Sequence, residues 1–184
     1  TSTPLLVGMN GFLSCYCGSI PTYTNDEEIL NVTLGAGSVS STCATTAPGP
    51  GSINQRYSNY LTSAPLASID QGSVYPLSIT LGTCGGNYNR AAKVWIDWDQ
   101  NGIFDDPTET VDNSGDISSS TANPPTNTGS VVVPLTAVPG NTGMRVSYYE
   151  TSAANITPCY NGTWGEVEDH LVTVVVPPPC TNPP

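Results

Sequence analysis

The residues with the clearest capacity for chemistry are oxygen-bearing side chains that cluster between positions 97 and 109. Their spacing follows a calcium-binding loop of the type D-x-[DN]-x-[DN]-G, with Gly102 in the sixth place. One departure is that the twelfth position is Thr108, so the acid arrives one place late. Calcium accepts irregular oxygen geometry better than magnesium does, so Ca²⁺ is the expected cation. The expected ligands are Asp97, Asp99, Asn101, the carbonyl of Ile103, Asp105 and Glu109.

A solvated turn is the alternative reading of this stretch, because Asp, Asn and Gly are also the usual residues of exposed turns. The crowding of the acids favours the cation. Neighbouring carboxylates repel one another, and a divalent ion bound through oxygen relieves that repulsion. Both readings stay open at the level of the sequence.

The segment just before the acids has the alternation of a β-strand. Val94, Ile96 and Trp98 alternate with polar or aromatic residues, and the pair Asn101-Gly102 then favours a tight turn. No helical periodicity flanks the acids, so the loop is predicted to extend from a strand and is not an EF-hand.

Charge and composition exclude several classes of function. The 184 residues hold four Lys and Arg against fifteen Asp and Glu, a net charge of −11. Nucleic acids and anionic membrane surfaces attract basic proteins, so neither is an expected partner. No apolar run is long enough for membrane insertion, and the start at Thr1 is interpreted as a processed, mature end.

Six cysteines in an acidic, Lys-poor chain indicate disulfides, an oxidising compartment and a secreted, cell-surface-associated protein. They are Cys15, Cys17, Cys43, Cys84, Cys159 and Cys180. Their connectivity cannot be read from the sequence, although Cys84 with Cys159 is one candidate pair. The absence of a C-x-x-C pair argues against zinc. Three sequons provide candidate glycan acceptors at Asn31, Asn155 and Asn161.

Short alternating segments separated by Gly- and Pro-rich turns predict an all-β fold, an antiparallel, jelly-roll-like β-sandwich stapled by disulfides. Strands are expected at 28–34, 56–61, 73–81, 93–99, 130–138, 143–150 and 171–176, with long loops at 36–55 and 112–129. Residues 15–176 form the domain and 177–184 a Pro-rich tail. Residues 1–14 form an apolar arm, either an edge strand of the same domain or a strand donated to a neighbour.

Four sequence features in order resemble the GEVED domain, a module of secreted and surface proteins of Bacteroidetes-type bacteria. They are Tyr16-Cys17, the run VWIDWDQNGIF at 94–104, PGNTGMRVS at 139–147 and GEVEDH at 165–170. His170 stands where an aromatic residue is usual, and Gly143 replaces a typical Arg. The resemblance implies a β-sandwich repeated in large multidomain surface proteins, in an accessory role without catalytic activity.

The last of these motifs also has a physical interpretation. Glu166 and Glu168 are expected on one face of the entrance to a strand, with Val167 facing the core. If the last two strands pair, Arg145 neutralises one carboxylate while Glu166 or Glu168 completes the cation shell. Alternatively, an acid of this motif simply pairs with Arg145.

Three classes of function remain. An enzyme is disfavoured, because the single His170 has no surrounding nucleophile motif and the clustered acids are spaced for a cation. A carbohydrate-binding module is the alternative, with a stacking platform drawn from Tyr57, Tyr60, Tyr88, Trp95, Tyr148, Tyr149, Tyr160 and Trp164. The leading hypothesis is a non-catalytic, calcium-stabilised structural or adhesive module of a surface protein or fibre. Its expected partners are copies of itself or neighbouring domains, with end-to-end assembly by strand addition.

Overall fold

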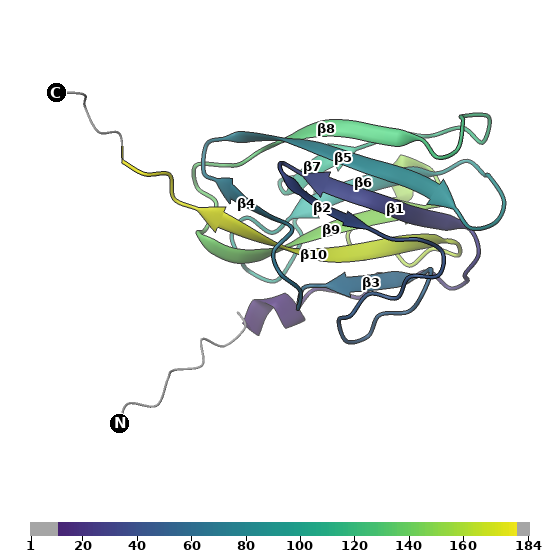
Figure 1. Ribbon diagram of the computed structural model, residues 1–184, viewed down its shortest axis with the longest axis horizontal. Helices are drawn as coiled ribbons and strands as arrows, with labels where there is room; N and C mark the ends of the chain where they lie inside the picture. Colours follow the sequence, from purple (N-terminus) through teal and green to yellow (C-terminus); the bar gives the residue numbers. More distant parts are fainter. Residues whose placement is uncertain (1–10, 180–184) are drawn as a thin grey trace.

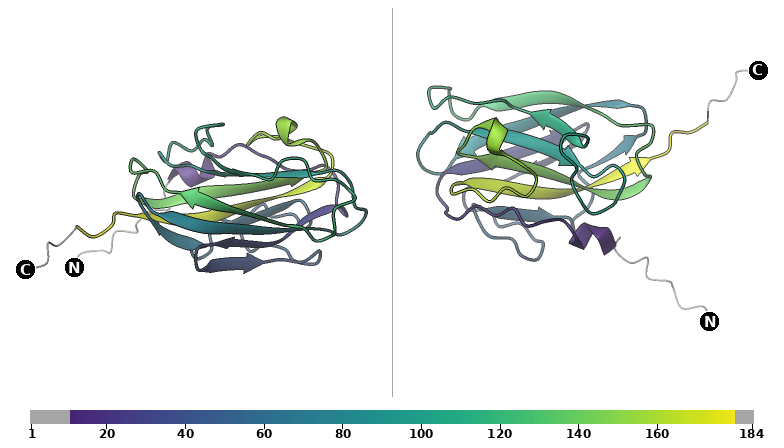
Figure 2. Two further views of the ribbon diagram at one scale, coloured as in Figure 1. Left: turned by 90° about the horizontal axis from the view of Figure 1, so that it is seen from above. Right: turned by 180° about the vertical axis from the view of Figure 1, so that it is seen from behind.

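The computed structural model describes residues 11–179, which form a sandwich of two β-sheets (Figures 1 and 2). The first sheet has four strands in the order β2-β1-β5-β8: β1 Glu27–Leu34, β2 Gly37–Ser40, β5 Val74–Thr83 and β8 Thr126–Val132. The second sheet has the order β3-β10-β9-β6-β7, with β4 also paired to β10. Its strands are β3 Tyr57–Tyr60, β4 Ala67–Asp70, β6 Ala91–Ile96, β7 Thr110–Asn113, β9 Gly140–Tyr149 and β10 Gly165–Val175.

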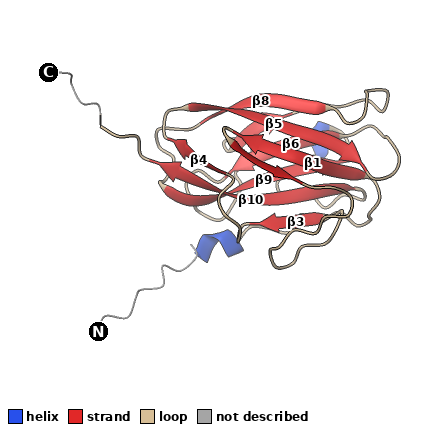
Figure 3. Cartoon of the chain, in the orientation of Figure 1, coloured by secondary structure: helices blue, strands red, loops and turns tan. Residues whose placement is uncertain are grey.

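Only two short 3₁₀ turns interrupt the strands and loops of the described chain, η1 (Gly11–Ser14) and η2 (Ala153–Asn155) (Figure 3). The expected disulfide-stapled, all-β sandwich is therefore confirmed. Within residues 11–179, no helix is long and apolar enough to cross a membrane.

The main core lies between the two sheets and follows from the period-two alternation of the strands. Leu77, Ile79 and Leu81 of β5 point inward and are at most 1% exposed. They pack against inward residues of the other sheet such as Val94 and Val146, which are paired across β6 and β9. Burying each such side chain stabilises the fold by about 1.5–3 kcal/mol.

A second apolar cluster covers the outer face of the larger sheet. Its members are Ala91, Trp95, Phe104, Tyr149, Ala153, Ile156 and Val167, with Tyr16, Tyr57 and Tyr160 packed against them. Loops and the N-terminal end of the described chain supply several of these residues. The larger sheet is consequently buried on both faces, and this accounts for the lack of simple apolar–polar alternation in β9 and β10.

The last strand, β10, lies in the interior of its sheet (Figure 1). It pairs antiparallel with β9 but parallel with β3 and β4, so this sheet is mixed where an antiparallel one was expected. Parallel neighbours need a long connection between them, and the roughly one hundred residues between β4 and β10 supply it.

Several strand boundaries differ from those expected. The loops expected at 36–55 and 112–129 contain β2, the end of β7 and the start of β8. Strand β4 had no distinctive alternation and was not expected. Residues 11–14 of the apolar arm form the turn η1 and are not an extended strand, while residues 1–10 lie outside the described residues.

Two disulfides staple the sandwich, and they correct the expected pairing of Cys84 with Cys159. Cys84 is bonded to Cys43, and Cys159 is bonded to Cys17. The Cys43–Cys84 bond agrees with the topology, because β2 and β5 both run antiparallel to β1, ending opposite Asn31 and Glu27, so both chains continue toward the same end of the sheet. Within residues 11–179, Cys15 has no disulfide partner. Cys180 lies beyond the described range, so its expected oxidation stays a prediction.

Candidate metal centre

The acidic loop begins where β6 ends, and its first carboxylate is fully buried. Asp97 is 0% exposed and lies on the outer face of the sheet, on the same side as Trp95. Its Oδ1 accepts a hydrogen bond from the Asn101 amide (3.2 Å) and its Oδ2 accepts one from the Gly102 amide (3.1 Å). Gly102 has φ +85°, a conformation that favours glycine, so the sixth position of the loop has the residue its geometry requires.

The late acid of the loop returns to the same place. Glu109 is 5% exposed, and its Oε1 accepts the Trp98 amide (2.6 Å) while Oε2 accepts the Asp105 amide (2.9 Å). Carboxylate oxygens of Asp97, Asp99 and Glu109 lie within 4.8 Å of one another. The one-residue displacement in sequence therefore does not remove Glu109 from the cluster.

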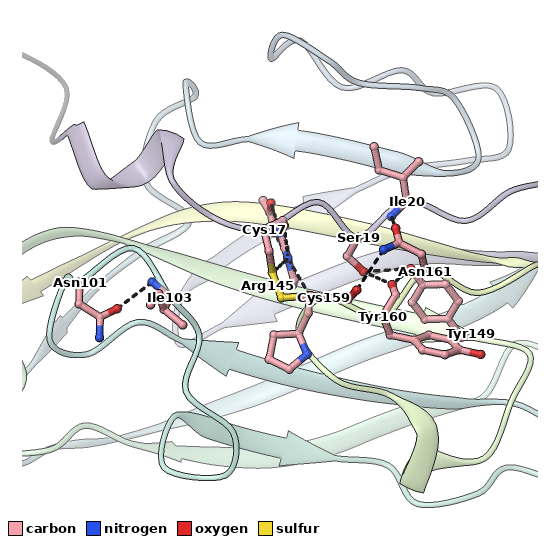
Figure 4. The surroundings of a disulfide bond; sticks show 12 residues. Cys17, Ser19, Ile20, Asn101, Ile103, Arg145, Tyr149, Cys159, Tyr160 and Asn161 are labelled. Atoms are coloured by element: carbon pink, nitrogen blue, oxygen red, sulfur yellow. Dashed lines mark hydrogen bonds and ion pairs between the residues drawn. A yellow bond between two sulfur atoms is a disulfide. The ribbon is translucent and has the colours of Figure 1, made fainter.

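The exposed part of the loop is tied together by Asn101. Its Nδ2 donates to Oδ2 of Asp99 (3.1 Å) and to Oδ2 of Asp105 (3.3 Å). Its Oδ1 accepts the amide of Ile103 (2.7 Å), a contact drawn in Figure 4. The structure thus brings Asp105 next to the three clustered acids, whereas the Ile103 carbonyl as a ligand stays a prediction.

The cluster is electrostatically unfavourable as an isolated set of anions. Burial raises the pKa of Asp97 above its ordinary value. Burial, together with the charges of Asp97 and Asp99, raises the pKa of Glu109 to about 7. The available donors are carboxylate and amide oxygens, which are the ligands that hard cations take. A divalent ion there would offset the repulsion and the loss of solvation.

Tyr16 connects the N-terminal end of the described chain to this loop. Its hydroxyl donates to Oδ2 of Asp97 (2.9 Å) and accepts the amide of Gly143 (3.0 Å). Its ring stacks on Phe104 with centroids 4.3 Å apart. Burial, and then the charge of Asp97, raises the pKa of the Tyr16 hydroxyl, which therefore stays a donor at neutral pH. Sequence reasoning did not include Tyr16 in the site, although the Tyr16-Cys17 pair was noted as a family feature.

Arg145 forms a second buried centre beside the loop. Its guanidinium makes two hydrogen bonds of 2.7 Å to Asp169 on the neighbouring strand. Its Nη1 donates to the carbonyls of Cys17 (2.8 Å) and Pro158 (2.7 Å), next to the Cys17–Cys159 disulfide (Figure 4). Phe104 of the acidic loop lies 5.1 Å from the guanidinium carbon. The expected pairing of Arg145 with an acid of the last strand is therefore observed.

Glu166 and Glu168 do not reach the loop, contrary to the expectation that one of them completes its shell. Glu168 pairs with Val146, which faces the core between the sheets, whereas Asp97 lies on the opposite face. Side chains two apart on a strand share a face, so Glu166 points inward as well. Its oxygens accept the amide of Ile29 (2.7 Å) and the hydroxyl of Ser58 (2.9 Å). Val167 faces outward, into the second apolar cluster.

His170 is buried on the same inward face as these glutamates. Its Nε2 lies 2.9 Å from Oε2 of Glu168, and its ring stacks on Tyr60 with centroids 5.0 Å apart. Burial lowers the pKa of His170 to about 4 and raises that of Glu168 well above its ordinary value. The imidazole of His170 is therefore uncharged at neutral pH.

Comparison with known families matches the part of the chain that carries both centres. The sequence profile of the GEVED domain matches residues 91–173, which run from β6 through the acidic loop to β10. The matched stretch is similar to the GEVED domain and spans a little under half of the chain. The resemblance seen in the sequence is thereby confirmed for this region, and the motif that gives the GEVED domain its name lies in the interior strand β10.

Solved structures with a similar arrangement have low sequence identity to this protein. A CARDB domain from Pyrococcus furiosus, solved in complex with di-metal ions, is 10% identical, with 86% of this chain and 95% of that chain covered and a TM-score of 0.38. A Niemann-Pick type C2 protein from the Japanese carpenter ant is 12% identical, covering 62% and 83%, with a TM-score of 0.33. An AA10 lytic polysaccharide monooxygenase from Streptomyces lividans is 12% identical, covering 58% of each chain, with a TM-score of 0.30. Among curated proteins, no sequence matches this one.

Most aromatic residues considered for a stacking platform are structural. Trp95, Tyr148 and Tyr149 are at most 1% exposed, and Tyr60 is buried against His170. Trp164 and Tyr88 remain exposed. Sequence reasoning missed Tyr23, whose exposed ring lies 5.9 Å from that of Trp164, because its bridge to Trp164 joins distant parts of the chain.

The three sequon asparagines differ in their surroundings. Asn155 and Asn161 are exposed, and Asn161 donates to the carbonyl of Cys159 while accepting the amide of Ile20. Asn31 is half-buried in β1, where its Nδ2 bonds to Ser38 and Ser40. Asn155 and Asn161 are thus the more accessible acceptors, and their use stays a prediction.

Proposed function

We propose that this protein is a non-catalytic, calcium-stabilised structural module of an extracellular surface protein or fibre. The observation that carries the proposal is the acidic loop, where Asp97, Asp99 and Glu109 converge within 4.8 Å and Asp105 lies beside them. Their backbone hydrogen bonds hold the carboxylates in place before any ion binds. Such preorganisation lowers the cost of binding, because the loop need not be ordered at that moment.

The position of the loop supports a stabilising role for the ion. Phe104 packs from the loop into the second apolar cluster and against Arg145. An ion that fixes the loop therefore also holds Phe104 against the outer face of the larger sheet. Two disulfides add further constraint and are typical of proteins from oxidising compartments.

Chelation tests this proposal directly. The thermal unfolding midpoint would be measured with CaCl₂ in hundredfold excess over Kd and with a chelator, with disulfides intact. Binding to the folded state alone should add about 2.7 kcal/mol of stability at that excess. Magnesium at equal concentration is the matched control and should add less. An unfolding midpoint that calcium leaves unchanged rules out the calcium-stabilised module.

Assembly through strand addition is the second part of the proposal. Strands β2 and β8 end the four-stranded sheet, and β8 carries the outward apolar residue Val132, which is 64% exposed. Edge strands offer backbone groups to an incoming strand. The apolar segment at residues 4–7 is the candidate donor, and it lies outside the described residues.

Deleting residues 1–10 should convert assemblies to monomers in analytical ultracentrifugation while the thermal unfolding midpoint stays constant. Unchanged assemblies would refute this mode.

A carbohydrate-binding module is the second candidate, supported by the exposed pair Tyr23 and Trp164. Aromatic faces suit the apolar faces of sugar rings. Glycan-array binding that is lost in Trp164→Ala and retained in Tyr88→Ala, a second exposed aromatic variant, would favour it. An array without binding removes this candidate.

A further inference from the structure

The N-terminal segment, residues 11–17, packs directly on the acidic loop. A Cβ added at Gly102 would lie 2.9 Å from Cβ of Cys15 and 3.2 Å from the carbonyl oxygen of Phe12, so the two backbones approach closely. The ring of Phe12 meets that of Tyr16 edge-on at 6.4 Å. The segment is thus held on top of the loop by backbone, ring and hydroxyl contacts.

Within the described residues, Tyr16 is the only side chain of this segment that hydrogen-bonds to the clustered carboxylates. A carboxylate offers about four acceptor positions. Three positions on Asp97 are taken by the Asn101 amide, the Gly102 amide and the Tyr16 hydroxyl. Oδ2 is thus held by the Gly102 amide and the Tyr16 hydroxyl together, and the fourth acceptor position lies on Oδ1.

The Tyr16 hydroxyl also accepts the amide of Gly143 on β9. It cannot move away from Asp97 without breaking this bond and the stack on Phe104. The orientation of Asp97 and the docking of the N-terminal segment therefore depend on the same contacts of Tyr16. Partners that orient a metal ligand through hydrogen bonds typically change metal affinity by about 10–100-fold when they are removed.

We propose that Tyr16 is a positioning residue of the cation loop, and that cation binding and docking of residues 11–17 stabilise each other. This inference rests on the proposed calcium site. It gives the site a regulatory role, because the cation then helps to hold residues 11–17 on the loop. By reciprocity, whatever fixes the segment raises cation affinity by the same factor.

The test compares two tyrosines whose hydroxyls make the same kind of hydrogen bond. Tyr16 and Tyr57 each donate to a buried aspartate Oδ2, at 2.9 and 2.8 Å, but the acceptor of Tyr57 is Asp169 and not a carboxylate of the loop. Calorimetric titration with CaCl₂ should show affinity about tenfold or more weaker in Tyr16→Phe. Tyr57→Phe should bind as the wild type does. Equal binding by the wild type and Tyr16→Phe overturns the inference and leaves the calcium site standing. A wild type that does not bind calcium overturns both.

A second measurement needs no variant and so does not depend on the folding of Tyr16→Phe. Hydrogen exchange of a peptide covering residues 11–17 would be followed in the wild type with CaCl₂ and with a chelator. Calcium should slow exchange there, and the amide of Gly143 should be protected in parallel. Slowed exchange confined to the loop at 97–109 would overturn the coupling while confirming the site.

Discussion

Arg145 and Asp169 face each other across β9 and β10 in a two-point salt bridge, with both N–O distances 2.7 Å. Both side chains are at most 2% exposed. Burial lowers the pKa of Arg145, but the charge and hydrogen bonds of Asp169, with contributions from Tyr57 and Tyr149, together outweigh it and raise the pKa, so the guanidinium stays charged. The fork of the guanidinium matches the carboxylate, a geometry that lysine does not provide.

Breaking this pair should be costly. Arg145→Met leaves the Asp169 carboxylate buried without its cation, and the free energy of unfolding should fall by about 3–5 kcal/mol in a urea titration. The double variant Arg145→Met with Asp169→Leu removes both charges and should lose less than the sum of the single losses. Arg56→Lys, at a half-buried arginine outside the pair, is the control and should cost under about 1 kcal/mol. Strict additivity would contradict the pairing.

The acidic loop gives a charge-matched test of the cation site. Asp99 is exposed and belongs to the cluster, whereas Asp106 is exposed in the same loop and bonds only to Thr110 among the described residues. Asp99→Asn should abolish the calcium-dependent rise of the unfolding midpoint without destabilising the calcium-free protein. Asp106→Asn should preserve that rise. Equal responses would show that general charge, and not the cluster, controls the effect.

Glu28 should make stability fall as pH rises. Burial, and then the charge of Glu168, raises the pKa of Glu28 from 4.5 to about 7. Because the folded state holds this proton more tightly than the unfolded state, its contribution is full below pH 4.5 and is lost between pH 4.5 and 7. Glu28→Gln mimics the protonated form. It should raise stability at pH 8 by about 1–2 kcal/mol after allowance for solvent screening, with no gain at pH 4. A gain of equal size at both values would contradict the assignment.

The disulfide pattern predicts that removing each of the two bonds lowers the stability of the protein by a different amount. Peptide mapping without reduction should recover Cys17 linked to Cys159 and Cys43 linked to Cys84. Replacing either pair with alanine should cost about 2–5 kcal/mol. The Cys17–Cys159 bond closes the longer loop, 142 residues against 41, so its loss should cost more in the chain-entropy account. A peptide linking Cys84 to Cys159 would overturn this connectivity.

The acidic loop was predictable from sequence because its chemistry is local. Asp97, Gly102 and Asp105 lie within nine positions, and spacing alone reports which oxygens converge. Glu109 could be included despite its displacement, since a loop can absorb one residue. Strand β5 was equally predictable from the sequence, because Leu77, Ile79 and Leu81 alternate clearly with less buried residues.

The faces of β10 were not predictable in the same way. Glu166 and Glu168 are acids on a strand buried on both sides, and alternation does not tell which side holds the core. The register against Val146 decides it, and registers arise from long-range pairing. The role of Tyr16 depends likewise on a contact 81 positions along the chain. The parallel pairing of β3 and β4 with β10 had no local sequence signal either.

The interior position of β10 determines when this fold can form during synthesis. A ribosome delivers β3 and β4 well before residues 165–175 and β9 shortly before them, yet all three strands bond to β10. Until β10 emerges, the strand edges that it will cover have no partner and must stay unpaired or be shielded by a chaperone. Pairings over such sequence distances are slow to form. The larger sheet is therefore completed after translation of its last strand and not progressively from the N-terminus.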